Sequence, residues 1–319
     1  MDGTNSNAIV FIKTSRGFDD IVNIITGFPS TKNVLEHIIL LVVGIIIFLS
    51  SVFLNSVVIT AILGSSQLKA KVSCFTILVR SAMDLAFALV IFPFFITLLS
   101  KEIGLGKLNC NVIFTTKKRG ILFLGYSVTI MCMMNVERYM GILHPLTHRA
   151  KVTKTRLLKS TILGLAIQTI IFAPSIIDNQ ITPFIVAATT FLLTAITVFV
   201  YARIWFSQQH LRNVRLGRQL SAQSHFPVVT RNGRLMKEIK LARSSFMIVI
   251  CFLICFLPAT ISNIEMLRMQ PSFSLVVHER LFSLLAISST TLNSIIFFCT
   301  NRALRKSGIK SIKRTVLSR

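Results

Sequence analysis

Long apolar segments alternate with short polar ones along most of this chain. Seven of these segments are mostly apolar over the roughly 20 residues that a helix needs to cross a bilayer. They are residues 37–63, 72–100, 112–137, 157–177, 184–206, 244–267 and 276–300. The pattern predicts an all-α membrane protein with one seven-transmembrane helix bundle (37–300). An N-terminal segment (1–36) precedes the bundle and a short tail (301–319) follows it.

The placement of charge predicts the orientation of the bundle. The net charge is +24, although only 14% of the residues are charged and 53% are hydrophobic. Most of the lysines and arginines lie in the loops after the first, third and fifth segments and in the tail. Positive charge beside short loops marks the cytoplasmic side of a membrane protein. We therefore expect the N-terminus outside and the C-terminus inside, membrane lipids as neighbours, and no nucleic-acid partner.

Arg138 is the most informative charge, because it ends the third segment within Glu137-Arg138-Tyr139. Glu137 and the isolated Glu238, before the sixth segment, are the acidic residues that we expect on the cytoplasmic side. In one interpretation Arg138 snorkels to the lipid headgroups and anchors the helix end. In the other, the two carboxylates cage Arg138 and form a switch. The isolation of Glu238 in a basic stretch favours the switch.

Further short motifs follow one another in order along the seven segments. They are Asn55; Asp84; Glu137-Arg138-Tyr139; His144-Pro145-Leu146; Tyr201; Cys255-Phe256-Leu257-Pro258; and Asn293-Ser294-Ile295-Ile296-Phe297. Together they resemble the rhodopsin-like (class A) G-protein-coupled receptors. The resemblance implies that 301–319 forms a short amphipathic eighth helix, beginning at Asn301, and a short cytoplasmic tail. Cys110 has no cysteine partner in an outer loop, so no disulfide is expected. This feature and a short second outer loop loosely resemble the melanocortin–lipid–adenosine branch.

The resemblance implies a plasma-membrane receptor and not an enzyme. An extracellular small molecule, lipid or peptide would activate a heterotrimeric G protein through outward movement of helix six about Pro258. The switch residues implied are Glu137, Arg138, Tyr139, Tyr201, Glu238, Pro258 and Asn293. A proline kink that serves packing alone remains the alternative at Pro258.

Three departures from the family pattern keep other functions open. Phe256 replaces a tryptophan, Ser294 a proline and Phe297 a tyrosine. A weakly signalling or orphan receptor-like scaffold is therefore an alternative. A small transporter is the alternative from another class, although the inverted repeats common in transporters are not visible.

Asp84 lies in the middle of the second segment, where a carboxylate is costly and marks a functional site. Ser127 is roughly 16 Å along the third helix from Arg138, which places it near Asp84 together with Ser289, Thr290 and Asn293. The resemblance implies a pocket for an allosteric sodium ion here. A protonated Asp84 bound to Asn293, without an ion, remains the alternative. Arg80 is one turn from Asp84, and a pair between them would weaken the sodium interpretation.

Lys117, Lys118 and Arg119 form a cationic run near the outer end of the third segment. If they line a vestibule above Phe256, they favour an anionic ligand. Alternatively, the helix begins near Gly120 and the cations are solvated, or acidic residues of the outer loops neutralise them. The seventh segment lacks the lysine of a retinal-binding opsin, and the middle of the third lacks the aspartate of an amine receptor.

Overall fold

The computed structural model describes residues 31–103, 110–174, 181–221, 246–247, 249–251, 253–262 and 273–317. The side chains of residues 110–117, and of several other helical positions, also lie outside the described part. The helices are α1 (Thr31–Leu63), α2 (Ser66–Ala70), α3 (Val72–Ile103), α4 (Cys110–Leu143), α5 (Pro145–Lys151), α6 (Lys154–Phe172), α8 (Thr182–Ser221), α10 (Phe273–Thr300) and α11 (Arg302–Leu317). Residues described within 246–262 are helical as well.

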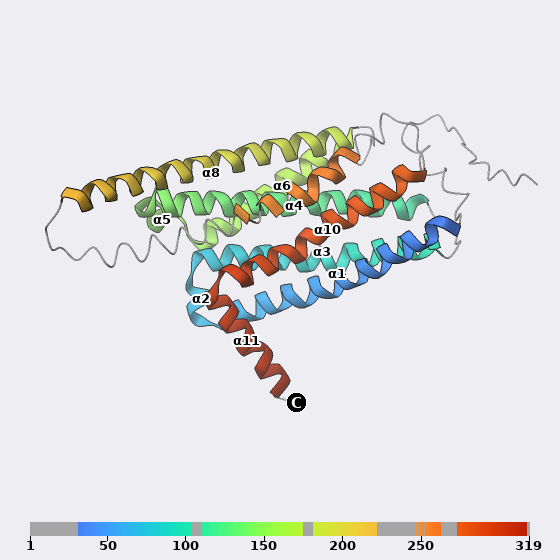
Figure 1. Cartoon of the computed structure of the whole chain (residues 1–319), viewed down its shortest axis with the longest axis horizontal. Helices are drawn as coiled ribbons and strands as arrows, with labels where there is room; N and C mark the ends of the chain where they lie inside the picture. Colours follow the sequence, from blue (N-terminus) through green and yellow to red (C-terminus); the bar gives the residue numbers. More distant parts are fainter. Residues whose placement is uncertain are drawn as a thin grey trace, which may run out of the picture.

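The long helices run lengthwise beside one another and form a bundle (Figure 1). Helix α1 packs against α3 and α10, α3 packs against α4, and α4 packs against α6 and α8. Six of the described helices are long and apolar enough to cross a membrane, and Val249–Ser262 is a shorter apolar helix. The prediction of an all-α membrane bundle is confirmed.

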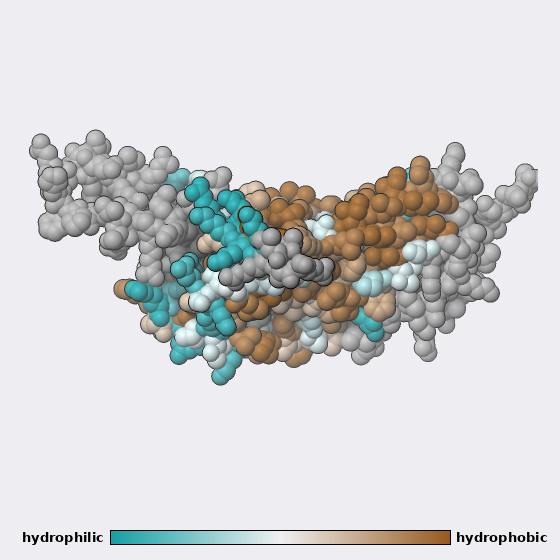
Figure 2. All heavy atoms as spheres, turned by 90° about the horizontal axis from the view of Figure 1, so that it is seen from below, coloured by the Kyte–Doolittle hydropathy of each residue, from teal (hydrophilic) through white to brown (hydrophobic). Residues whose placement is uncertain are grey.

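Apolar and hydrophilic side chains occupy different parts of the bundle surface along its length. Brown apolar side chains cover much of the face in Figure 2, and teal hydrophilic side chains gather at the left end. On α1, Ile39, Ile46 and Phe53 are each more than half exposed, at 53%, 58% and 57%. Such residues suit contact with lipid tails. The end that carries α2, α5 and the start of α11 is called the basic end below (Figure 1).

The stretch 139–160 at the basic end is largely helical, although the sequence analysis treated it as the loop after the third segment. Helix α4 continues to Leu143, and α5 begins at Pro145 in its first turn. Proline suits that position because its fixed φ matches the helix and its missing N–H would have no intrahelical partner. Thr153 then caps α6, and its hydroxyl accepts a hydrogen bond of 3.3 Å from Arg156 N.

Two glycines allow α4 and α6 to approach closely. A Cβ atom at Gly125 would lie 2.6 Å from Nε2 of Gln168 and 3.2 Å from its Cδ. A Cβ atom at Gly164 would lie 3.0 Å from Cγ2 of Thr129. Gln168 and Thr129 are buried, and the Thr129 hydroxyl also lies 3.4 Å from Gln168 Oε1. Small residues commonly form such helix crossings in membranes, where van der Waals packing drives association.

Gly125→Ala is expected to destabilise the bundle, because the new methyl group overlaps the buried Gln168 side chain. Overpacking of this kind costs about 1–3 kcal/mol. Thermal unfolding of the purified protein in detergent measures the effect. Combining Gly125→Ala with Gln168→Ala should recover part of the loss, since the smaller side chain leaves room for the methyl group. If the loss of stability in the double variant equals the sum of the losses in the two single variants, the two residues do not share this contact.

Candidate functional site

Asp84 lies at the centre of a buried group of polar side chains from three helices. Its Oδ2 atom is 3.1 Å from Nε of Arg80 on α3 and accepts a hydrogen bond of 3.0 Å from Nδ2 of Asn293 on α10. Its Oδ1 atom accepts a bond of 3.4 Å from the hydroxyl of Ser127 on α4. Nη1 of Arg80 also donates to the backbone carbonyl of Ser127. Both charged side chains are buried, at 1% and 0% exposure.

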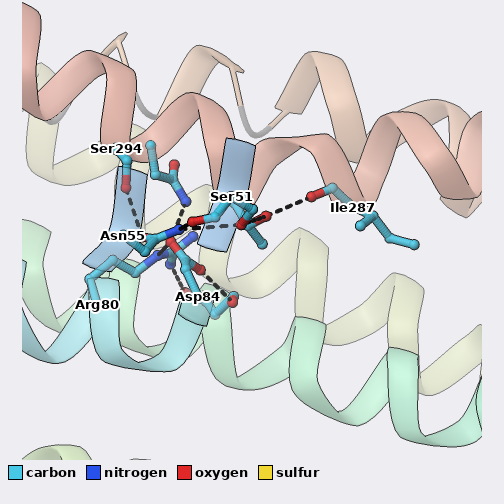
Figure 3. Close-up of polar contacts among 9 residues, drawn as sticks. Ser51, Asn55, Arg80, Asp84, Ile287 and Ser294 are labelled. Atoms are coloured by element: carbon cyan, nitrogen blue, oxygen red, sulfur yellow. Dashed lines mark hydrogen bonds and ion pairs between the residues drawn. The ribbon is translucent and has the colours of Figure 1, made fainter. Parts of the chain in front are cut away.

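A second set of contacts extends this group to α1 (Figure 3). The Ser294 hydroxyl donates to Asn55 Oδ1 over 2.7 Å. Asn55 Nδ2 donates to the carbonyl and hydroxyl oxygens of Ser51, over 2.9 and 3.3 Å. The Ser51 and Thr290 hydroxyls share a hydrogen bond of 3.2 Å. We call Ser51, Asn55, Arg80, Asp84, Ser127, Thr290, Asn293 and Ser294 the central polar cluster.

Most of the residues expected around Asp84 are therefore brought together. Ser127 and Asn293 contact the carboxylate directly, as does Arg80. Ser289 is buried on α10 but makes no hydrogen bond to Asp84 within the described part of the chain. Thr290 contacts α1 instead. The proposed sodium ion at Asp84 stays a prediction.

Arg138 is buried at the basic end of α4, with 2% of its side chain exposed. Its Nη1 atom lies 3.2 Å from Oε2 of Glu137, and its Nη2 atom donates to the carbonyl of Ser73 on α3 over 3.2 Å. Its Nε and Nη1 atoms have no hydrogen-bond partner among the described residues, so its contact with Glu137 is an ion pair without hydrogen-bond geometry. A buried guanidinium with an unused donor is suited to a change of partner, since an unsatisfied group is costly.

His148 is a member of this site that the sequence analysis missed. Its Nε2 atom lies 3.1 Å from Oε1 of Glu137. Glu137 therefore stands between an arginine on its own helix and a histidine on α5. The contact depends on the packing of α5 against the end of α4. Pro145, at the start of α5, is the sequence feature that favours a new helix here. We call Glu137, Arg138 and His148 the arginine cluster.

Three further switch residues, and Phe256 of the predicted vestibule, lie in described helices. The Tyr201 hydroxyl, on α8, donates to Asn135 Oδ1 over 3.1 Å, one turn before Arg138 on α4. Tyr139 packs against a buried apolar cluster that contains Ile142, Val200 and Ile204. Pro258 is half-buried in the helical segment 253–262. Phe256 is 5% exposed and belongs to the main apolar core.

Other predicted site residues are only partly described. Glu238 and the side chain of Lys117 lie outside the described residues. Lys118 is half-buried, whereas Arg119 is exposed, and its guanidinium carbon lies 5.4 Å from the ring centre of Phe94 on α3. A guanidinium over an aromatic face is a favourable cation–π contact. It places Arg119 beside α3, in the half of α4 that lies away from the basic end.

Two comparisons with known proteins agree with this geometry. The model of the family described as 7 transmembrane receptor (rhodopsin family) matches residues 54–297, which is most of the chain. The chain is also similar to an alpha-1A adrenergic receptor of Oryzias latipes, with 22% identity over 325 aligned residues. That alignment covers 88% of this chain and 67% of the receptor. The matched residues 54–297 include Asp84, the arginine cluster and Asn293.

Ser294→Ala is expected to lower the stability of the bundle, because it leaves the buried Asn55 Oδ1 without its hydroxyl donor. An unsatisfied buried acceptor costs about 1–3 kcal/mol. The matched control is Ser160→Ala, whose exposed hydroxyl donates only to Arg156 O in its own helix. Thermal unfolding of both variants in detergent makes the comparison. Equal unfolding temperatures for the two variants would contradict the role given to Ser294.

Proposed function

Because this chain belongs to the rhodopsin family of seven-transmembrane receptors, we propose that it couples an extracellular ligand to a heterotrimeric G protein. It is a multi-pass membrane receptor and not an enzyme. The proposed location is the plasma membrane, with the basic end in the cytoplasm, because lysines and arginines gather on cytoplasmic loops. The N-terminus is then extracellular, and α11 lies on the inner leaflet.

The arginine cluster is the observation that carries this proposal. Glu137 holds Arg138 against α4, and His148 holds Glu137 from α5. The Ser73 carbonyl holds the same guanidinium towards α3. In this state Arg138 is directed into the bundle and is buried. While Arg138 is buried, its charge is not accessible to a G protein. If activation releases Arg138 at the cytoplasmic face, the receptor can bind its G protein in the active state only.

The proposed activation step is an outward movement of helix six, meaning the sixth transmembrane segment, whose described residues lie within 246–262, and not α6. Pro258 lacks a backbone N–H, which weakens the helix at that point. Described contacts of the segment's inner half are apolar: Val249 lies in the main core, and the Phe246 ring centre is 5.2 Å from that of Tyr201. Apolar contacts can separate without leaving a buried charge. Ligand and G protein then favour the same state, and each increases the affinity for the other. A role for Glu238 in holding the inactive state stays part of this proposal.

The ligand is proposed to be anionic rather than an amine. The similar receptor is named for adrenergic ligands. Helix α4 of this chain, however, carries no acidic residue before Glu137 and contains Lys117, Lys118 and Arg119 instead. A cationic vestibule would attract a carboxylate or phosphate group on a small molecule, lipid or peptide.

The weakly signalling scaffold is the second candidate, because Phe256, Ser294 and Phe297 depart from the family pattern. All three residues have defined places in the structure. Ser294 donates to Asn55, whereas Phe256 and Phe297 are 5% and 2% exposed in the main core. The basal rate of nucleotide exchange on purified G proteins separates a signalling receptor from a scaffold. Ion or solute flux in proteoliposomes tests the transporter alternative.

Glu137→Gln is expected to raise basal signalling, because the neutral amide holds Arg138 less strongly. Weakening this buried ion pair by about 1.4 kcal/mol, which is one decade in an equilibrium constant, should raise the active fraction roughly tenfold. Cyclic AMP and calcium in transfected cells measure this at matched surface expression. His148→Ala should give a smaller increase, since it removes only the support of Glu137.

The control for this experiment is Glu36→Gln, which changes an exposed acid on α1. It should leave basal signalling at the wild-type level. Unchanged basal signalling in both Glu137→Gln and His148→Ala would contradict the switch proposed for the arginine cluster.

Replacing Lys117, Lys118 and Arg119 together by glutamine tests the charge of the ligand. For an agonist found by screening, the effective concentration should rise by about tenfold or more, which corresponds to 1.4 kcal/mol of lost binding. A dose–response curve at matched surface expression gives the result. Unchanged potency would contradict an anionic ligand while leaving the receptor assignment in place.

A further inference from the structure

A guanidinium lies beside the carboxylate at the centre of the membrane, where the sequence analysis expected an ion. Arg80 and Asp84 are one turn apart on α3, and both are buried among the bundle helices. We propose that Arg80 is a built-in counterion that takes the place of sodium at Asp84, so that the receptor's conformational equilibrium does not depend on sodium. This inference concerns the folded bundle and does not rest on the proposed G-protein coupling.

The oxygen atoms that a hard cation would need are already engaged. Asp84 Oδ2 accepts from both Arg80 Nε and Asn293 Nδ2, and Oδ1 accepts from the Ser127 hydroxyl. The backbone carbonyl oxygen of Ser127 accepts from Arg80 Nη1. Hard cations bind oxygen lone pairs, whereas Asn293 presents its amino group and Arg80 presents N–H donors. As they are arranged here, these residues do not fit a sodium ion.

Electrostatics leads to the same conclusion. Asp84 and Arg80 together are neutral, which lowers the cost of a charged group in the middle of a membrane. A sodium ion beside Asp84 would also lie next to a buried guanidinium, and like charges repel strongly where the dielectric is low. The Arg80 Nη2 atom is buried and has no hydrogen-bond partner among the described residues. This face of the guanidinium offers an ion only further N–H groups.

The position of Arg80 on the same helix as Asp84 has a consequence for regulation. Side chains four residues apart on a helix are neighbours, so this pair forms wherever α3 is helical. Movement of α4, α10 or helix six leaves the distance between them unchanged. An ion held by several helices, in contrast, is released when those helices separate. The counterion of Asp84 is therefore the same in every conformation of this receptor. Sodium then has no higher affinity for one conformation than for another and does not shift their populations.

Thermal unfolding of the purified full-length protein in detergent tests this inference without a ligand. The unfolding temperature is measured in sodium chloride and in N-methyl-D-glucamine chloride at equal ionic strength. We expect the wild type to unfold at the same temperature in both salts. Arg80→Leu frees the oxygen atoms of Asp84 and Ser127, so sodium should raise its unfolding temperature by about 2 °C or more.

Two further variants serve as controls. Arg80→Lys retains a cation beside Asp84 and should stay indifferent to sodium. Arg80→Leu combined with Asp84→Asn removes the carboxylate and should lose the sodium response. If Arg80→Leu does not fold, the wild type and Arg80→Lys still test the proposal. Equal unfolding temperatures in the two salts support it, and specific stabilisation of the wild type by sodium contradicts it.

The inference is overturned if sodium specifically stabilises the wild type and Asp84→Asn abolishes that effect. It is also overturned if folded Arg80→Leu gains no response to sodium, because Arg80 would then not be the residue that excludes the ion. Neither result depends on whether the receptor activates a G protein. A failure of G-protein coupling would conversely leave the salt comparison unaffected.

Discussion

The bundle is organised around the need to partner a carboxylate in the middle of the membrane. Asp84 has no water to solvate it there, so side chains from neighbouring helices must do so. Arg80 supplies the opposite charge, and Ser127 and Asn293 supply hydrogen bonds from α4 and α10. Asn293 is followed by Ser294, which binds Asn55 on α1. The contacts of Asp84, together with the bond between Ser294 and Asn55, thereby fix how α1, α3, α4 and α10 are rotated relative to one another.

This arrangement also accounts for a departure from the family pattern. A proline after Asn293 would remove a backbone N–H and bend α10. Ser294 instead keeps the helix regular, and its hydroxyl satisfies the amide oxygen of the fully buried Asn55. The four helices therefore form a rigid frame held by polar contacts. Helix six packs on this frame partly through apolar residues such as Val249 and Phe256, which suits an element that moves.

The sequence predicted the elements and the charged positions because those signals are local. Span length follows from apolar runs, and the pair of Arg80 with Asp84 follows from their spacing on one helix. Contacts between helices were harder to predict. The bond of His148 to Glu137 depends on a short helix that was taken for a loop. The bonds of Ser294 to Asn55 and of Arg80 to the Ser127 carbonyl depend on how neighbouring helices are rotated, which no single segment specifies.

When a G protein binds, we expect helix six to move against a fixed frame formed by α1, α3, α4 and α10. Pulsed electron spin resonance can measure this with one spin label at Met247, which is exposed in the helix-six segment, and one at Gln67 on α2. A second pair, Gln67 and Lys306, reports the frame itself, and exposed Cys299 is replaced by serine. A nucleotide-free G protein should lengthen the first distance by more than about 2 Å and leave the second unchanged. Bound G protein with an unchanged first distance would contradict the proposed movement of helix six.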